Sequence, residues 1–198
     1  QQDKVQKLGI LGGGQLARMM IPTLKKWAIS FTILDQKSCV SSDFCHEFID
    51  GDFKSKEDVF KGMKDCEVLT YDLESVSLEG VKALEESGVR LSPSYNVLAT
   101  IQDKGKQKDF FKDNNIPTSN YLLVEDHFNE LPEGFIKLRR GGYDGKGVFS
   151  WRPGDIFPEE FKKPIVWEEK VAIEKEISVL VARNDHGEMV AYEPVEMV

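Results

Sequence analysis

Residues 137–147 read Lys137-Leu138-Arg139-Arg140-Gly141-Gly142-Tyr143-Asp144-Gly145-Lys146-Gly147, with four glycines and four cations among them. Two apolar runs flank this stretch, Gly134–Leu138 and Val148–Trp151, and they predict two β-strands joined by a loop. Glycine permits positive φ and a close approach of the backbone to a ligand, and successive free N–H groups form an anion-binding concavity. Taken alone, the stretch is either the solvated basic tip of a β-hairpin or a lid over an anionic ligand.

The composition excludes several classes of protein. The chain has 198 residues, an ordinary hydrophobic fraction of 40% and a net charge of −8, which argues against a general binder of nucleic acid or membrane surfaces. No apolar run approaches the roughly 18 residues that a membrane-spanning helix needs. The N-terminus is polar and lacks the apolar core of a signal peptide, so a cytoplasmic location is predicted.

The cysteines and histidines indicate neither a disulfide framework nor a metal site. Three irregularly spaced cysteines fit a reducing compartment. Cys39, Cys45 and His46 lie close in sequence, but no second ligand pair follows at zinc spacing. We therefore predict no metal ligands within this chain, and we assign the isolated histidines to the surface or to turns.

The N-terminal residues predict a βαβ unit. A strand at 5–11 leads into Gly12-Gly13-Gly14, then a helix begins at Gln15, and a second strand covers Ser30–Asp35. Such a unit directs a helix N-terminus and free N–H groups at an anion. Pro22 is expected to kink this helix or to end its first segment. The glycines also fit G-x-G-x-x-A with Asp35 as a ribose-binding acid, so an NAD site competes with the reading of Asp35 as a solvated strand-end acid.

The alternation of strands and helices continues to about residue 95. Strands are predicted at 48–53, 66–71 and 89–93, and helices at 55–64, 78–86 and from Ser94 toward Ile101. The pattern predicts a doubly wound, Rossmann-like α/β domain with a parallel sheet. Glu74 follows the strand at 66–71, where ligands bind in such sheets. It is a candidate substrate contact or a helix-start acid, with equal weight.

Beyond residue 115 the pattern changes to antiparallel strands. A helix at 103–114, with Phe110 and Phe111 facing inward, precedes strands at 121–124, 135–138, 165–168, 177–182 and 188–192. Lys104 stands at the start of this helix, where a cation is unfavourable for the helix dipole. That position is a mild hint of another role, but a solvated lysine is the more common explanation of such a position.

Five stretches carry a resemblance to a known family and run in the order that the family has. They are Gly12–Met19, Leu69–Glu74, Gln102–Lys104, Lys137–Gly147, and Glu168 with Glu176–Val179. The chain resembles the N5-carboxyaminoimidazole ribonucleotide synthases, also called ATPase subunits of phosphoribosylaminoimidazole carboxylase, which are ATP-grasp ligases of purine biosynthesis. The resemblance implies a pre-ATP-grasp domain at 1–95 and the first part of an α+β ATP-grasp domain at 96–198.

The resemblance also implies an ATP site. Lys137 would reach the α- and β-phosphates, the loop at 142–148 would fold over them, the segment from Glu168 would lie beside adenine, and Glu176 would hold the ribose. The implied ATP contacts are Lys104, Lys137, Gly142, Tyr143, Asp144, Gly145, Lys146, Gly147, Val148, Glu168, Glu169, Lys170, Val171 and Glu176. Catalytic roles are implied for Lys137, Lys146, Tyr143 and Asp144.

The implied reaction joins three small molecules. ATP would phosphorylate bicarbonate to carboxyphosphate, which would carboxylate the exocyclic amine of 5-aminoimidazole ribonucleotide and leave ADP and phosphate. Gly13, Gly14, Gln15 and Leu16 would cradle the ribonucleotide's 5′-phosphate, and Glu74 and Tyr143 would contact the ribonucleotide or the reaction centre. The family expectation is a homodimer. Mg²⁺ ligands, and the rest of the ATP-grasp domain, are expected beyond residue 198, so this chain alone is expected to be inactive.

Two departures and three alternatives accompany this resemblance. Lys104 stands where the family usually has Arg, which removes a bidentate fork, and Ala17 stands where Gly is usual, a change the helix should tolerate.

The alternatives are another ATP-grasp carboxylate–amine ligase or carboxylase, an NAD-binding dehydrogenase, and a non-catalytic nucleotide-binding module. The dehydrogenase hypothesis explains the first βαβ unit and assigns no role to 137–147 or 168–176.

Overall fold

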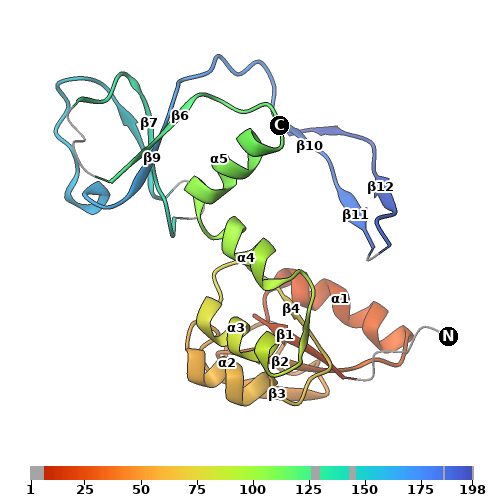
Figure 1. Cartoon of the computed structure of the whole chain (residues 1–198). Helices are drawn as coiled ribbons and strands as arrows, with labels where there is room; N and C mark the ends of the chain where they lie inside the picture. Colours follow the sequence, from red (N-terminus) through yellow and green to blue (C-terminus); the bar gives the residue numbers. More distant parts are fainter. Residues whose placement is uncertain (1–6, 126–129, 143–145, 185, 198) are drawn as a thin grey trace.

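The computed structural model describes residues 7–125, 130–142, 146–184 and 186–197. Two β-sheets are connected through two short helices, α4 (Tyr95–Ile101) and α5 (Lys104–Asp113), which lie between them (Figure 1). The N-terminal sheet is parallel and the second sheet is antiparallel. This confirms the predicted change from α/β to α+β structure.

The N-terminal sheet contains five parallel strands in the order β3-β2-β1-β4-β5. The strands are β1 (Lys7–Leu11), β2 (Ser30–Asp35), β3 (Glu47–Asp50), β4 (Val68–Tyr71) and β5 (Arg90–Leu91). The helices that connect them are α1 (Gln15–Lys26), α2 (Lys56–Met63) and α3 (Leu78–Glu86). Because the order reverses at β1, the carboxyl ends of β1 and β4 form the crevice where such sheets bind ligands.

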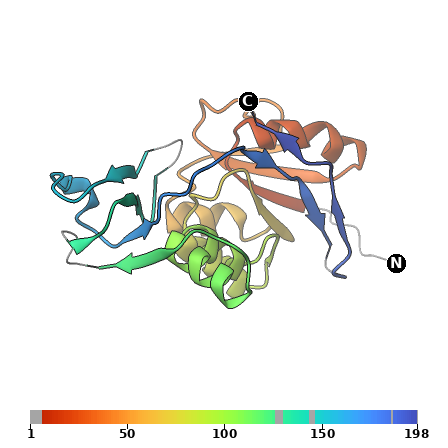
Figure 2. The ribbon, with the colours of Figure 1, turned by 90° about the horizontal axis from the view of Figure 1, so that it is seen from above.

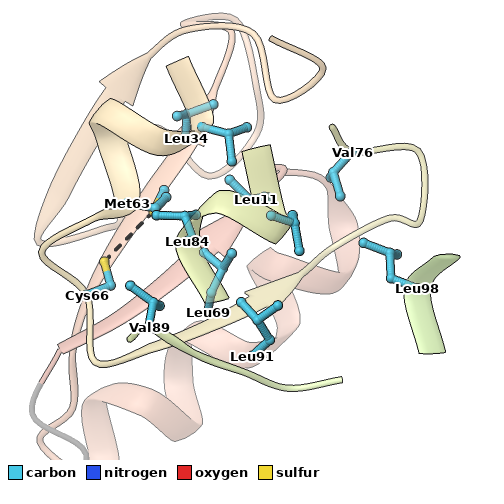
Figure 3. Close-up of a cluster of buried hydrophobic side chains, with 12 residues drawn as sticks. Leu11, Leu34, Met63, Cys66, Leu69, Val76, Leu84, Val89, Leu91 and Leu98 are labelled. Atoms are coloured by element: carbon cyan, nitrogen blue, oxygen red, sulfur yellow. Dashed lines mark hydrogen bonds between the residues drawn. The ribbon is translucent and has the colours of Figure 1, made fainter. Parts of the chain in front are cut away.

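Alternating side chains distribute the helices over both faces of this sheet. Ile10 and Ile33 are fully buried in a cluster with residues of α1, whereas the next residues, Leu11 and Leu34, are buried against α2 and α3. Neighbouring side chains in a strand point to opposite faces, so consecutive apolar residues need a helix on each side. Figure 3 shows the second cluster, in which Leu84 of α3 packs beside Leu11 and Leu69 of the sheet.

Serine side chains cap two helices of the N-terminal domain, whereas the helix end predicted at Pro22 is not observed. The Ser55 side chain accepts a hydrogen bond from the N–H of Asp58 (3.2 Å), and Ser77 caps α3 in the same way. Pro22 was predicted to kink α1 or to end its first segment; the predicted end is wrong, because the helix continues to Lys26, and the kink stays a prediction. Pro22 lies on the exposed side of α1, where water can satisfy the carbonyl that loses its intrahelical partner.

The second sheet is antiparallel, in the order β6-β9-β7-β8. Its strands are β6 (Tyr121–Val124), β7 (Gly134–Leu138), β8 (Val148–Trp151) and β9 (Ile165–Glu168), with a short helix η2 (Glu159–Phe161) packed on one face. Ile136, Trp151 and Trp167 are buried on that face. The opposite face of β7 and β9 therefore carries Lys137 and Glu168 toward α5.

The described residues of 169–184 and 186–197 form an exposed arm. Among the described residues, its short strands pair with one another: β10 (Ile177–Ser178) with β13 (Val195–Glu196), and β11 (Val181–Arg183) with β12 (Met189–Ala191). The arm and the four-stranded sheet lie on opposite sides of the molecule (Figure 1, Figure 2).

The prediction that Phe110 faces inward is also wrong. Its side chain is 49% exposed and lines a groove between α4 and α5.

Candidate functional site

The glycine turn after β1 is held by two carboxylates. Asp35 Oδ2 accepts a hydrogen bond from the N–H of Gly13 (2.7 Å) and Oδ1 accepts one from Gln36 (2.6 Å). Asp72, directly after β4, accepts from the N–H of Gly14 (2.8 Å) and of Ala17 (2.6 Å). Both oxygens of Asp35 are therefore engaged by the backbone, which argues against Asp35 as a free ribose acid of an NAD site.

The Asp72 carboxylate occupies the anion position at the start of α1. It uses the N–H of Gly14, one of the predicted phosphate donors, and Asp35 uses that of Gly13. In the described part of the chain, the N–H groups of Gln15 and Leu16 have no acceptor, and both residues are exposed. Ala17 is fully buried, so its methyl is accommodated as expected.

A small cavity joins the N-terminal sheet to the root of the 137–147 loop. Gln102 donates to the carbonyl oxygens of Glu74 (2.6 Å) and Val76 (2.8 Å), which holds the loop after β4 against the end of α4. Lys104 Nζ donates to the carbonyl oxygen of Gly141 (3.1 Å). The cavity between them has a volume of about 100 Å³ and is lined by Glu74, Ser75, Ile101, Gln102, Lys104, Arg140, Gly141 and Gly142.

A second cavity, of about 220 Å³, lies between α5 and the antiparallel sheet. It is lined by Lys104, Gln107, Lys108, Phe111, Lys137 and Glu168. Glu168 pairs with Phe135 across β7 and β9, so Lys137, two residues further along β7, lies diagonally opposite on the same face. Lys137 Nζ contacts Glu168 Oε1 at 2.9 Å, and Lys108 Nζ contacts Glu168 Oε2 at 3.0 Å.

Glu168 remains ionised in this cluster although it is largely buried. Burial raises the pKa of its carboxyl group, but hydrogen bonds from Lys137 and then Lys108 outweigh that effect and leave the pKa below its ordinary value. Ser119 Oγ also donates to Glu168 Oε2 at 2.9 Å. The cavity thus holds one buried carboxylate and two bonded cations, with Lys104 as a third lysine on its wall.

The loop after β7 is closed at its root by backbone bonds. The N–H of Leu138 donates to the carbonyl oxygen of Gly147 (2.9 Å). Gly141 and Gly142 have φ of +73° and +77°, and a Cβ at Gly142 would overlap the carbonyl oxygen of Lys146. Only glycine fits such a position without strain. Tyr143, Asp144 and Gly145 of this loop lie outside the described residues.

The family of the chain follows from two domain models that match in succession. Residues 5–102 match the ribonucleotide synthetase preATP-grasp domain, and residues 109–198 match the ATP-grasp domain. The chain belongs to the ATP-grasp family. Its parallel sheet and its antiparallel sheet fall in the first and second matched ranges, respectively.

Individual ATP-grasp relatives match along almost the whole chain. N5-carboxyaminoimidazole ribonucleotide synthase of Saccharolobus solfataricus is 32% identical over 95% of the chain and 53% of the relative. The crystal structure of the Thermotoga maritima synthetase has a TM-score of 0.82 at 35% identity, covering 97% of this chain and 53% of that one. The Aspergillus clavatus synthase complexed with ATP has a TM-score of 0.87 at 26% identity, covering 98% and 54%. The chain thus spans about half the length of these relatives.

Some predicted ATP-grasp contacts lie away from the 220 Å³ cavity. Glu169, Lys170, Val171 and Glu176 are exposed and belong to the arm. The Glu169 side chain accepts from Asn120 Nδ2 at 2.6 Å, and the Glu176 carbonyl oxygen accepts from the N–H of Met197 at 3.0 Å. Their roles beside adenine and ribose remain predictions. Val148, at the start of β8, pairs with Lys137.

Sequence reasoning missed Asp103, which connects α5 to the root of the loop. Its carboxylate is 2% exposed, caps α5 through the N–H of Gly105 (3.0 Å), and contacts Arg139 Nε (2.7 Å) and Arg140 Nε (3.4 Å). Burial raises the pKa of Asp103, but the hydrogen bond from Arg139 leads the effects that leave it lowered overall. An Asp directly before a lysine-rich helix was the available signal, since Asp is a favoured N-cap.

Asp103→Asn should destabilise the protein in a pH-dependent way. Asn keeps the cap but loses the charge opposite Arg139 and Arg140, so we expect a loss of about 2 kcal/mol at pH 7. Because the folded pKa of Asp103 lies below its unfolded value of about 3.9, this contribution is present above that value and is lost as pH falls through the folded pKa. Denaturant unfolding of the complete protein at pH 7 and pH 3 measures it.

The exposed acid Asp65 provides the matched control for this charge removal. Asp65→Asn should change stability by less than about 0.5 kcal/mol at either pH. An Asp103→Asn loss that is equal at pH 7 and pH 3 would show that the two arginine contacts do not carry the effect.

Neither a metal cluster nor a membrane-spanning helix is found in the described ranges. No group of three or more His, Cys, Asp or Glu side chains there is arranged to hold a metal ion. Within the same ranges, every helix is too short or too polar to cross a bilayer.

Proposed function

We propose that the complete protein is an ATP-dependent ligase that carboxylates 5-aminoimidazole ribonucleotide with bicarbonate and forms N5-carboxyaminoimidazole ribonucleotide, ADP and phosphate. One observation carries this proposal. Lys104 lines both the lysine cavity with Lys137 and Glu168 and the smaller cavity with Glu74 and Gly142. The cavity proposed for the phosphates and the cavity proposed for the acceptor thus share one cation, which supports transfer of an activated carboxyl group between them. The relatives named above carry this activity in their names.

The lysine cavity suits the phosphates of ATP. Lys137 and Lys104 supply positive charge on its wall, and both are only partly buried, so they can reach a ligand. The reaction needs no covalent enzyme nucleophile. Its rate enhancement would come from positioning and from neutralisation of negative charge on the transferred phosphoryl group. Lys146, Tyr143 and Asp144 of the loop are proposed to act at the same place.

The smaller cavity suits a small anionic intermediate. Its volume of about 100 Å³ is lined by Arg140 and Lys104 and by the turn at Gly141 and Gly142. Carboxyphosphate carries several negative charges, which these cations would offset. Glu74 also lines this cavity and would contact the amine that accepts the carboxyl group.

The ribonucleotide would reach this cavity from the glycine turn. Asp72 binds the N–H of Gly14, and the chain continues from Asp72 to Glu74 two residues later. The free N–H groups of Gln15 and Leu16 would then receive the 5′-phosphate. Gly13 and Gly14 would shape the turn around the phosphate instead of donating to it, because carboxylates already accept their N–H groups.

Mg²⁺ would neutralise charge on the phosphates of bound ATP. The described carboxylates do not form its site, because Glu168 is bonded to two lysines and no group of three or more His, Cys, Asp or Glu side chains in the described residues is arranged to hold a metal ion. The domain division near residue 95, the homodimer and the cytoplasmic location remain our predictions.

The second candidate is another ATP-grasp carboxylate–amine ligase or carboxylase. It would keep Lys104, Lys137 and Glu168 and change the ligand at the glycine turn. The capture of the Gly13 and Gly14 N–H groups by Asp35 and Asp72 favours this alternative, because it leaves only Gln15 and Leu16, of the four predicted donors at the turn, for an acceptor's phosphate.

Release of ADP distinguishes these candidates. In the complete protein supplied with ATP, Mg²⁺ and bicarbonate, we expect ADP release to rise at least about tenfold when 5-aminoimidazole ribonucleotide is added. Release that is indifferent to this ribonucleotide would overturn the leading proposal. Release that responds to a different amine or carboxylate would support the second candidate.

A further inference from the structure

Lys108 is the most enclosed cation of the lysine cluster and was not predicted to take part in the site. Its side chain is 10% exposed, compared with 30% for Lys137. Lys104 and Lys108 lie one helical turn apart, so both face the antiparallel sheet from α5. Burying an ammonium group is costly unless it is paired and hydrogen-bonded.

The Lys108 ammonium has its full set of acceptors. It contacts Thr118 Oγ1 at 2.7 Å, Ser119 Oγ at 3.0 Å and Glu168 Oε2 at 3.0 Å. An ammonium has three donors, so Lys108 cannot bind a ligand without giving up one of these bonds. Ser119 Oγ in turn donates to Glu168 Oε2. Lys108, Ser119 and Glu168 Oε2 form a closed, partly buried arrangement.

Lys137 differs in both respects. Its described polar contact is with Glu168 Oε1 at 2.9 Å, which leaves donors for a ligand, and it is three times as exposed as Lys108. The carboxylate of Glu168 thus has one fixed cation, Lys108, on Oε2 and one adaptable cation, Lys137, on Oε1. If Lys137 turned toward a phosphate without Lys108 present, a buried carboxylate would be left uncompensated, which is strongly unfavourable.

We propose that Lys108 is a positioning residue that acts through Glu168. It is the fixed counterion that holds the Glu168 carboxylate in place, so that Lys137 can move from Glu168 Oε1 to a phosphate of ATP. This inference rests on the proposed function, because it assumes that ATP occupies the lysine cavity. Lys108 itself contacts no substrate.

The groups around Glu168 define how this role depends on pH. Lys108 and Lys104 face it from α5, Lys137 from β7, and Ser119 from the segment before β6. Tyr121 of β6 pairs with Glu168 in the sheet, but its hydroxyl donates to Asp109. Removing Lys108 should therefore raise the tendency of Glu168 to bind a proton, since one of two bonded cations is lost.

The test measures ATP binding to the complete protein by isothermal titration calorimetry. Lys108→Met should raise the Kd for ATP at least about tenfold, because Glu168 then retains Lys137. The matched control is Lys106→Met, which removes an exposed lysine from the same helix and should change the Kd less than about twofold. Equal Kd values for Lys108→Met and Lys106→Met would overturn the inference.

A double-mutant cycle tests whether the effect passes through Glu168. In a Glu168→Gln background there is no carboxylate to retain Lys137, so Lys108→Met should cost no more than Lys106→Met does. A full tenfold cost in that background would overturn the proposal. If the wild-type protein does not bind ATP at all, the proposed function fails. If wild type binds and the two lysine variants do not differ, only this inference fails.

The pH profile separates positioning from a merely structural role. At lower pH the variant's Glu168 would bind a proton more often than that of wild type and so release Lys137 more often; the ratio of Kd values, Lys108→Met over wild type, should therefore fall between pH 7 and pH 5. A constant ratio would overturn the proposal. Should Lys108→Met fail to fold, Ser119→Ala removes two bonds from this arrangement, one to Lys108 and one to Glu168, and should show the same pH trend at smaller amplitude; a constant Ser119→Ala ratio would likewise overturn it.

Discussion

Lys137→Met should weaken ATP binding by the complete protein at least about a hundredfold, close to abolition in a practical assay. Methionine keeps most of the side-chain length but removes the charge that lies 2.9 Å from Glu168 and faces the 220 Å³ cavity. Truncating one member of a buried, hydrogen-bonded charge pair costs about 2–5 kcal/mol, and each 1.4 kcal/mol corresponds to about tenfold in affinity. Titration calorimetry with ATP measures this loss.

Lys112→Met is the control for the Lys137 experiment. Lys112 is an exposed lysine in the last turn of α5, outside the 220 Å³ cavity. Its replacement removes the same charge and should leave the Kd within about twofold of wild type. An unchanged affinity in Lys137→Met would refute the assignment of Lys137 to the phosphates.

Gly14→Ala should have the second largest effect, and it should act on the acceptor instead of on ATP. A Cβ at Gly14 would overlap Asp72 Oδ2, which accepts the N–H of Gly14 itself. Asp72 would have to move and would lose its bonds to Gly14 and Ala17 at the start of α1. Two charge-assisted hydrogen bonds contribute about 3 kcal/mol together. We expect the KM for the ribonucleotide to rise at least about thirtyfold, with the Kd for ATP unchanged.

Gly51→Ala controls for the loss of a glycine. A Cβ there would approach the flexible Asp58 side chain at 3.3 Å, a contact that a small shift relieves. Steady-state kinetics with varied ribonucleotide compare the two variants. If Gly14→Ala and Gly51→Ala have the same KM, the acceptor does not bind at the turn after β1. If Gly14→Ala weakens ATP binding equally, the two cavities are not separate subsites.

Much of the fold followed from local patterns. Apolar runs that include Ile10-Leu11 and Ile33-Leu34 predicted the first two strands, and Ser55 marked the start of α2. These signals depend only on residues that are close in sequence, so they can be interpreted without tertiary contacts. The helix end at Pro22 and the inward position of Phe110 were wrongly predicted. Both depend on which side of a helix faces solvent, and the neighbouring residues in the sequence do not show that.

The candidate site was predictable in part. Lys104, Lys137 and Glu168 were predicted as contacts of one ligand, and the structure brings them to one cavity. The roles of Lys108, Asp103 and Asp72 were not predicted, because each depends on a partner more than thirty residues away in sequence: Lys108 with Glu168, Asp103 with Arg139, and Asp72 with Gly14. Charged residues on helices are usually solvated, and only the packing of α5 on β9 distinguishes Lys108 from its exposed neighbours.

The most direct measurement follows carbon from bicarbonate. Complete protein is supplied with ATP, Mg²⁺, 5-aminoimidazole ribonucleotide and ¹³C-labelled bicarbonate, and NMR follows the labelled carboxyl group while a coupled assay follows ADP. We predict one labelled carboxyl group on the exocyclic amine for each ADP released, with both lost in Lys137→Met. ADP released without label on that amine, or label carried by a different acceptor, would contradict the proposed carboxylation.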